Sequence, residues 1–166
     1  MTGTPFSILI EKFLHLVEKD KSYFRYFELT DEQAMELARL RASHFLDEAV
    51  GRLIFEGKPT VDFTDIDVAT QSFNFELTSR ELTLLPSLMY QVYLERDIAY
   101  LKTLSVNFVD KNLKTYDPSN ARQSFLTLYN TIAARNAAWI DDYKNCDRTS
   151  GDFNPITFAA YDITEA

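Results

Sequence analysis

The chain has 166 residues, of which 46% are hydrophobic and 14% aromatic, and its formal net charge is −8. This apolar content excludes a disordered chain, and the length allows one domain with a core that needs no disulfides. The acidic balance disfavours tight binding to DNA or RNA, because the phosphate backbone favours clustered positive charge. The single cysteine excludes an intramolecular disulfide framework and fits a reducing compartment, or one where thiols do not matter.

The first predicted element is a short amphipathic helix over residues 5–19. Its apolar residues recur at spacings of three and four behind Pro5, a residue typical of the first helical position. Glu11 and Lys12 interrupt the apolar stretch, so we expect neither a signal peptide nor a membrane span. We expect the protein to be made and used in the cytoplasm of the cell that produces it.

A second, longer helix is predicted over residues 30–56. Thr30 and Gln33 form a capping-box pattern at its start, and acidic residues fill the first turn. The apolar stripe continues until Gly57 and Pro59, which end it.

Residues 58–77 alternate between apolar and polar types, which is typical of extended chain. We interpret this stretch as a surface excursion with extended pieces around a short turn of helix at 65–71. Three aromatic residues stand out in it: Phe63, Phe73 and Phe75.

The third predicted helix, over residues 78–106, contains a proline. Thr78 and Glu81 form a second capping box, and Pro86 follows about two turns later. An interior proline costs roughly 3 kcal/mol, but the apolar stripe keeps its phase on both sides of it. We therefore predict one bent helix rather than two.

The last helix is predicted over residues 118–144, with Asp117 as cap and Pro118 at the first helical position. Beyond it we expect an extended C-terminal arm, residues 147–166. The predicted fold is all-α: a bundle of about four helices in one domain, residues 1–146, followed by the arm.

The inventory of reactive groups is thin. His15 and His44 are predicted on separate helices, and Cys146 has no neighbouring histidine, so structural roles are favoured over metal binding or catalysis. The chain contains no glycine-rich phosphate loop and no zinc or serine-hydrolase motif. We predict no enzyme activity, no catalytic residue, no cofactor and no metal.

Two acidic groups remain as weaker candidates. Asp62, Asp65 and Asp67 are spaced as in a calcium loop, but the glycine that such a loop requires is missing. We interpret them as solvated loop acids or as partners for basic residues of a neighbouring chain. The polar residues of the third helix form either a buried polar site or simple surface ion pairs: Glu81, Glu95, Arg96 and Asp97.

Interaction with other proteins is the predicted role, through two segments. The arm carries apolar pairs one residue apart, as in a strand laid on another surface. Its alternative is an arm folded back on its own bundle, and the alternative for the aromatic residues of 58–77 is local packing. The candidate interaction residues are Phe63, Phe73, Phe75, Phe153, Ile156, Phe158, Tyr161 and Ile163.

Three stretches in order carry a family resemblance: FTDIDVATQSFNFELTSRELTLLPSLMYQVYLERDI, then FVDKNLKTYDPSNARQSFLTLYNTI, then WIDDY. Together they resemble the neck proteins of tailed bacteriophages, also called head-to-tail connector, adaptor or head completion proteins. The family pattern is F-x-x-x-L-T-x-x-E-I-x-I-L-A-x-L-M. It matches Phe73, Leu77, Thr78, Glu81, Leu82, Leu85, Leu88 and Met89.

The likeness covers about residues 27–143. Asp110, Lys114 and the segment 117–121 resemble the later part of the family pattern, whereas Pro86 stands where the family has a small helix-former. The arm is not covered.

The resemblance implies a structural protein of the virion, assembled in the host cytoplasm as a homo-oligomeric ring, commonly of about twelve copies. Such a ring sits between the portal protein and the tail or further neck proteins, and DNA passes through it as cargo. The alternative is a small cytoplasmic helical regulator that binds one partner protein. A third class is an enzyme that uses the acidic residues at 62–67 with a metal ion.

Overall fold

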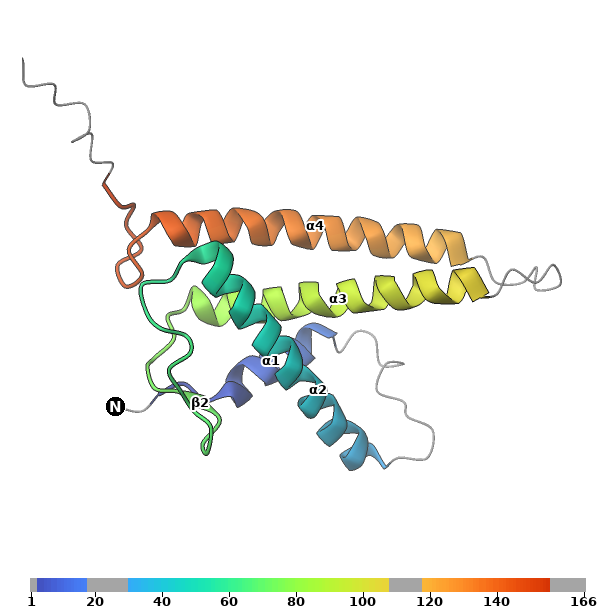
Figure 1. Cartoon of the computed structure of the whole chain (residues 1–166), viewed down its shortest axis with the longest axis horizontal. Helices are drawn as coiled ribbons and strands as arrows, with labels where there is room; N and C mark the ends of the chain where they lie inside the picture. The colour runs from blue at the N-terminus through green and yellow to red at the C-terminus, as the bar shows by residue number, and fades with distance from the viewer. Residues whose placement is uncertain (1–2, 18–29, 108–117, 156–166) are drawn as a thin grey trace, which may run out of the picture.

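The computed structural model describes residues 3–17, 30–107 and 118–155, and these are mostly helical (Figure 1). The elements in chain order are α1 (Phe6–Val17), α2 (Asp31–Arg52), the short π-helix η2 (Leu53–Gly57), β1 (Ile66–Asp67), β2 (Ser72–Phe73), α3 (Glu81–Asn107) and α4 (Pro118–Asn145). The predicted all-α fold with four helices is confirmed. The predicted end of the first helix at 18–19 and the cap residue Asp117 lie outside the described residues.

Both predicted capping boxes are present. The Gln33 backbone N–H donates to the Thr30 hydroxyl over 3.3 Å, and the Thr30 N–H donates to the Gln33 side chain over 3.1 Å. The same reciprocal pair joins Thr78 and Glu81, over 3.3 Å and 2.7 Å. The polar start signals therefore fixed where α2 and α3 begin.

Helix α3 continues through Pro86 without a break, as predicted. Proline has no backbone N–H, so the Leu82 carbonyl one turn earlier lacks its helical donor. The Lys12 ammonium of α1 donates to that carbonyl over 3.2 Å. A neighbouring helix thus supplies the hydrogen bond that Pro86 removes.

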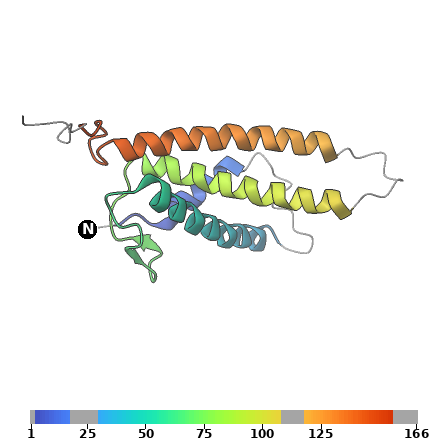
Figure 2. The same cartoon turned by 45° about the horizontal axis from the view of Figure 1, so that its top comes forward.

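Helix α3 is the central element and contacts α1, α2 and α4. In Figures 1 and 2, α3 and α4 run side by side in opposite directions, and their joined ends extend beyond α1 and α2. The core lies where α1 and α2 cross α3, and includes Leu9, Phe13, Leu46, Leu85, Leu88 and Met89.

The predicted helical turn at 65–71 is wrong: these residues form most of a small β-hairpin. Strands β1 and β2 pair antiparallel, with Ile66 opposite Phe73 and Asp67 opposite Ser72. The Asp67 carboxylate accepts the backbone N–H groups of Ala69 and Thr70, over 2.9 Å and 3.3 Å. Because such side-chain bonds satisfy the backbone locally, they favour a turn over a helix.

The N-terminal segment, residues 3–6, lies along the outgoing strand of this hairpin. Phe6 N–H donates to the Gln71 carbonyl over 2.8 Å, and Phe73 N–H donates to the Thr4 carbonyl over 3.0 Å. The Thr4 hydroxyl also accepts the Leu77 N–H over 2.9 Å. The start of the chain therefore fixes the segment that leads into α3.

The predicted arm does not begin as extended chain. After α4 the chain turns back, so that Phe153 pairs with Cys146 and the Asp147 N–H donates to the Asp152 carbonyl over 2.7 Å. The Asp147 carboxylate accepts two backbone N–H groups at 149 and 150, which closes the turn. Residues 156–166 lie outside the described residues.

Candidate functional site

Phe63 and Phe73, predicted as interaction residues, are buried in the structure, each with 1% of its surface exposed. Their rings pack edge to face with centroids 5.6 Å apart, and Phe63 meets the partly buried Phe75 at 5.3 Å. Phe6 of α1 covers Phe73 at 4.9 Å. Local packing is thus the interpretation that the structure shows for Phe63 and Phe73.

Of the predicted interaction residues in the arm, Phe153 is the one that the structure describes, and it is 76% exposed. Its backbone is held by the pairing with Cys146, while its side chain faces solvent. Ile156, Phe158, Tyr161 and Ile163 lie outside the described residues.

The acidic cluster is used within its own loop. Asp62 accepts bonds from the hydroxyl and the N–H of Thr64, and these bonds lower the pKa of Asp62. Asp65 accepts a bond of 2.7 Å from the Asn74 amide. Among the described residues, no group of three or more His, Cys, Asp or Glu side chains is arranged to hold a metal ion.

The polar residues predicted on the third helix divide into two kinds. Glu81 is fully buried, whereas Arg96 forms an exposed ion pair with Glu48 of α2. Glu95 is half-buried and accepts bonds from Arg52 over 2.9 Å and from the Tyr129 hydroxyl over 3.0 Å. Both interpretations of the group are therefore realised, at different positions.

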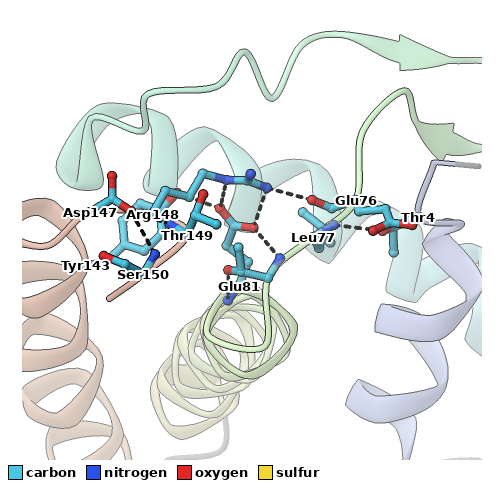
Figure 3. A network of polar contacts seen from close by, with 10 residues as sticks. Thr4, Glu76, Leu77, Glu81, Tyr143, Asp147, Arg148, Thr149 and Ser150 are labelled. Carbon is cyan, nitrogen blue, oxygen red and sulfur yellow. Dashed lines mark hydrogen bonds and ion pairs between the residues drawn. The ribbon is translucent and has the colours of Figure 1, made fainter. Parts of the chain in front are cut away.

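Glu81 is the centre of a buried polar network (Figure 3). Its carboxylate accepts Nε of Arg148 over 2.8 Å, Nη2 of Arg148 over 2.9 Å and the Tyr143 hydroxyl over 2.7 Å. Arg148 Nη2 also donates to the backbone carbonyl of Glu76 over 2.7 Å. We call this set of four residues the Glu81 junction.

The Glu81 junction joins the start of α3, the end of α4, the loop before α3 and the C-terminal turn. A bidentate arginine–carboxylate pair is among the strongest hydrogen-bonded contacts, and it satisfies the charge that burial would otherwise penalise. Among the described residues, every buried side-chain nitrogen and oxygen has a hydrogen-bond partner. The buried polar groups of the junction are thus all hydrogen-bonded, and the junction holds these four segments together.

The junction strongly perturbs one titration. Burial and the hydrogen bond to Glu81 raise the pKa of Tyr143 far above its usual value. A tyrosine so protected stays a neutral donor at physiological pH, so it is not poised for proton transfer. The arrangement is suited to holding segments together rather than to acid–base chemistry.

A second buried pair links the middle of the long helices. The Ser87 hydroxyl donates to the Asn136 side chain over 2.6 Å, and the Asn136 amide donates to the Ser87 carbonyl over 3.1 Å. The Asn136 amide also reaches Gln91 over 2.8 Å. These polar contacts fix the register between α3 and α4.

Beside the Glu81 junction lies a solvent-facing groove between the start of α3 and the end of α4, with a volume of about 420 Å³. We call it the end groove. Its lining includes Arg80, Thr83, Leu84, Trp139, Tyr143 and Phe153.

Sequence reasoning identified Glu81 as a capping residue but missed Tyr143, Arg148 and the end groove. Arg148 is 67 positions from Glu81, so no local spacing connects them. The one signal was an arginine four positions after the predicted end of the last helix.

The helices in the described ranges do not combine the length and apolar character that a membrane span needs. No family model matches the chain, and no curated protein or solved structure is significantly similar to it.

Proposed function

We propose that the chain is a non-catalytic structural protein of the neck of a tailed-phage virion. In this role copies form a ring between the portal protein and the tail or further neck proteins, and the ring conducts DNA. The observation that carries the proposal is the ordered resemblance over residues 27–143.

The roles of the matched residues support this proposal. Thr78 and Glu81 cap the central helix, and Leu85, Leu88 and Met89 lie in the core. A pattern made of capping and packing residues defines a scaffold, which is what a structural ring component needs. A buried network that fastens the C-terminal turn to the scaffold gives the arm a fixed point of departure.

The charge supports passage of DNA rather than its capture. With a net charge of −8 the protein repels a phosphate backbone at long range, so a lumen made of such copies lets DNA slide through. Ring formation also suits the shape, because identical elongated subunits can bury one repeated side contact around a closed ring.

The test is quantitative mass spectrometry of gradient-purified phage particles from the source, counting this chain against the major capsid protein. We expect about twelve copies per particle. Absence of the chain from mature particles would contradict the neck assignment and would favour a role with a partner in the infected cytoplasm.

A further inference from the structure

The end groove opens beside the place where the described chain ends. Its floor is formed by Leu84, Trp139 and Tyr143, and the exposed ring of Phe153 stands at its edge. The volume of about 420 Å³ falls within the roughly 300–1,000 Å³ of ordinary binding pockets. An apolar floor of this size suits a few large side chains.

The lining of the groove also includes one basic and one acidic side chain, Arg80 and Asp142. Arg80 is exposed, and the Arg135 guanidinium lies over the Trp139 ring at 4.7 Å from its centroid. Asp142 is the acidic residue in the lining. An occupant with large apolar side chains and an acidic group that reaches Arg80 would match this surface.

The C-terminal segment, residues 156–166, has that composition. It contains the apolar residues Ile156, Phe158, Tyr161 and Ile163, together with Asp162 and Glu165, and no lysine or arginine. These apolar residues form two pairs, 156/158 and 161/163, and the members of each pair are spaced like side chains on one face of a strand laid into a groove.

The described start of this tail favours binding to another molecule. In both views the red end of the described chain points away from the helices (Figures 1 and 2). Asn154 donates its N–H to the Asn145 carbonyl over 2.8 Å, which holds the start of the tail at the end of α4. Pro155 also restricts Asn154 to extended conformations.

We propose that the end groove binds residues 156–163 of a second copy of this chain, so that each subunit's arm is seated on its neighbour. The inference rests on the proposed ring and names the contact that closes it. The Glu81 junction holds the groove through Tyr143 and the turn that precedes the arm through Arg148. One network therefore positions both the binding site and the segment from which the arm leaves.

The test uses the full-length chain and a labelled synthetic peptide of residues 154–166, at protein concentrations low enough to keep the chain monomeric. Trp139 is the single tryptophan and lines the groove, so its fluorescence reports occupancy. We expect saturable binding by anisotropy with a matching change in Trp139 emission, and no binding of a peptide with the same residues in scrambled order.

Thr83→Glu tests the site, because it places a longer acidic side chain in the groove. The exposed Thr131 on α4 provides a matched control: it does not line the groove, and each threonine hydroxyl donates over 2.9 Å to the carbonyl four residues earlier. We expect Thr83→Glu to weaken peptide binding at least tenfold and Thr131→Glu to leave it unchanged. Absence of binding, or equal binding by Thr83→Glu, would overturn the proposal.

A third variant separates a neighbour's arm from the chain's own. Full-length chain carrying Phe158→Ser and Ile163→Ser has a disabled arm but an intact groove. If this variant binds the peptide and the unmodified chain does not, the groove is filled by its own arm and the second-copy assignment is wrong. Peptide binding does not depend on virions, so this result and the particle count fail independently.

Discussion

At the scale of single residues, Glu81 combines two properties that are rarely found together in a charged residue. It caps a helix, which needs a carboxylate at a defined position, and it is fully buried, which requires that the charge be paired. Arg148 and Tyr143 make the second condition possible. Removing Arg148 would leave the buried Glu81 carboxylate without its counter-charge.

Glu81→Ala is therefore expected to lower the free energy of unfolding by about 3 kcal/mol, measured by urea denaturation. Glu76→Ala is the control, because Arg148 contacts the backbone carbonyl of Glu76, which alanine retains, and the Glu76 side chain is exposed. Equal losses in the two variants would contradict the role given to the Glu81 carboxylate.

Tyr143 predicts a pH dependence of stability. Its folded-state pKa is raised, by burial first and then by Glu81, whereas the unfolded value is about 10. Above that pH the unfolded chain releases the proton that the folded chain retains, so stability falls as pH rises. We expect Tyr143→Phe to lose less stability than the unmodified chain between about pH 8 and pH 11, measured by thermal unfolding. Identical pH profiles would contradict this coupling.

Only part of this chemistry was predictable from the sequence. Thr78 and Glu81 are three positions apart, so the capping role of Glu81 followed from local rules. Its burial did not, because the partner arginine is 67 positions away and is brought in by a turn that Asp147 closes. Phe73 was open to two interpretations for the same reason, because the ring that covers it, Phe6, is 67 positions earlier in the chain.

At the scale of elements, the proline in α3 shows how one helix completes another. Apolar phase on both sides predicted that the helix would continue through Pro86, and it does. The compensation by Lys12 could not be read from α3, since it depends on how α1 packs.

We expect Lys12→Met to lower the free energy of unfolding by about 0.5–1 kcal/mol. In a Pro86→Ala background the same change should cost less, because residue 86 then has an N–H that bonds to the Leu82 carbonyl. Urea unfolding of the four chains of this double-mutant cycle measures the coupling. A cost for Lys12→Met that is independent of residue 86 would show that Lys12 acts elsewhere.

Two glycines test how the N-terminal segment is fixed. A Cβ added at Gly3 would lie 1.7 Å from the Phe73 carbonyl oxygen, whereas one at Gly51 in α2 meets nothing within 4 Å. We expect Gly3→Ala to destabilise the chain by at least about 1 kcal/mol and Gly51→Ala to stabilise it by about 0.5–1 kcal/mol. Thermal unfolding distinguishes them, and a neutral Gly3→Ala would mean that the segment can detach without cost.

The β-hairpin marks the limit of prediction from periodicity. Residues 65–71 contain no proline or glycine, and their alternation spans too few positions to separate a helical turn from a hairpin. What decided the outcome was the side-chain bonding of Asp67 together with pairing to a segment almost seventy positions earlier in the chain.

At the scale of the whole molecule, the C-terminal part divides at Pro155 into a root and an arm. The root, residues 147–155, is held by Arg148 and by the Arg80 guanidinium, which donates to the Gly151 carbonyl over 3.1 Å. In the proposed assembly the arm, residues 156–166, contributes to a neighbour and not to its own bundle. Folding and assembly should then respond differently to truncation.

Two truncated chains separate these effects. A chain ending at Pro155 keeps the Glu81 junction, so its free energy of unfolding should stay within about 0.5 kcal/mol of the full chain, while ring assembly is lost. A chain ending at Cys146 also removes Arg148 and should lose about 3 kcal/mol, as Glu81→Ala does. Urea unfolding measures the free energy of unfolding. Sedimentation velocity, or incorporation into particles, measures ring assembly. The two truncations differ by nine residues that the structure describes, 147–155. A large loss of stability on removing 156–166 alone would mean that the arm packs on its own bundle. Intact assembly of the chain that ends at Pro155 would mean that the ring closes through contacts between the helices.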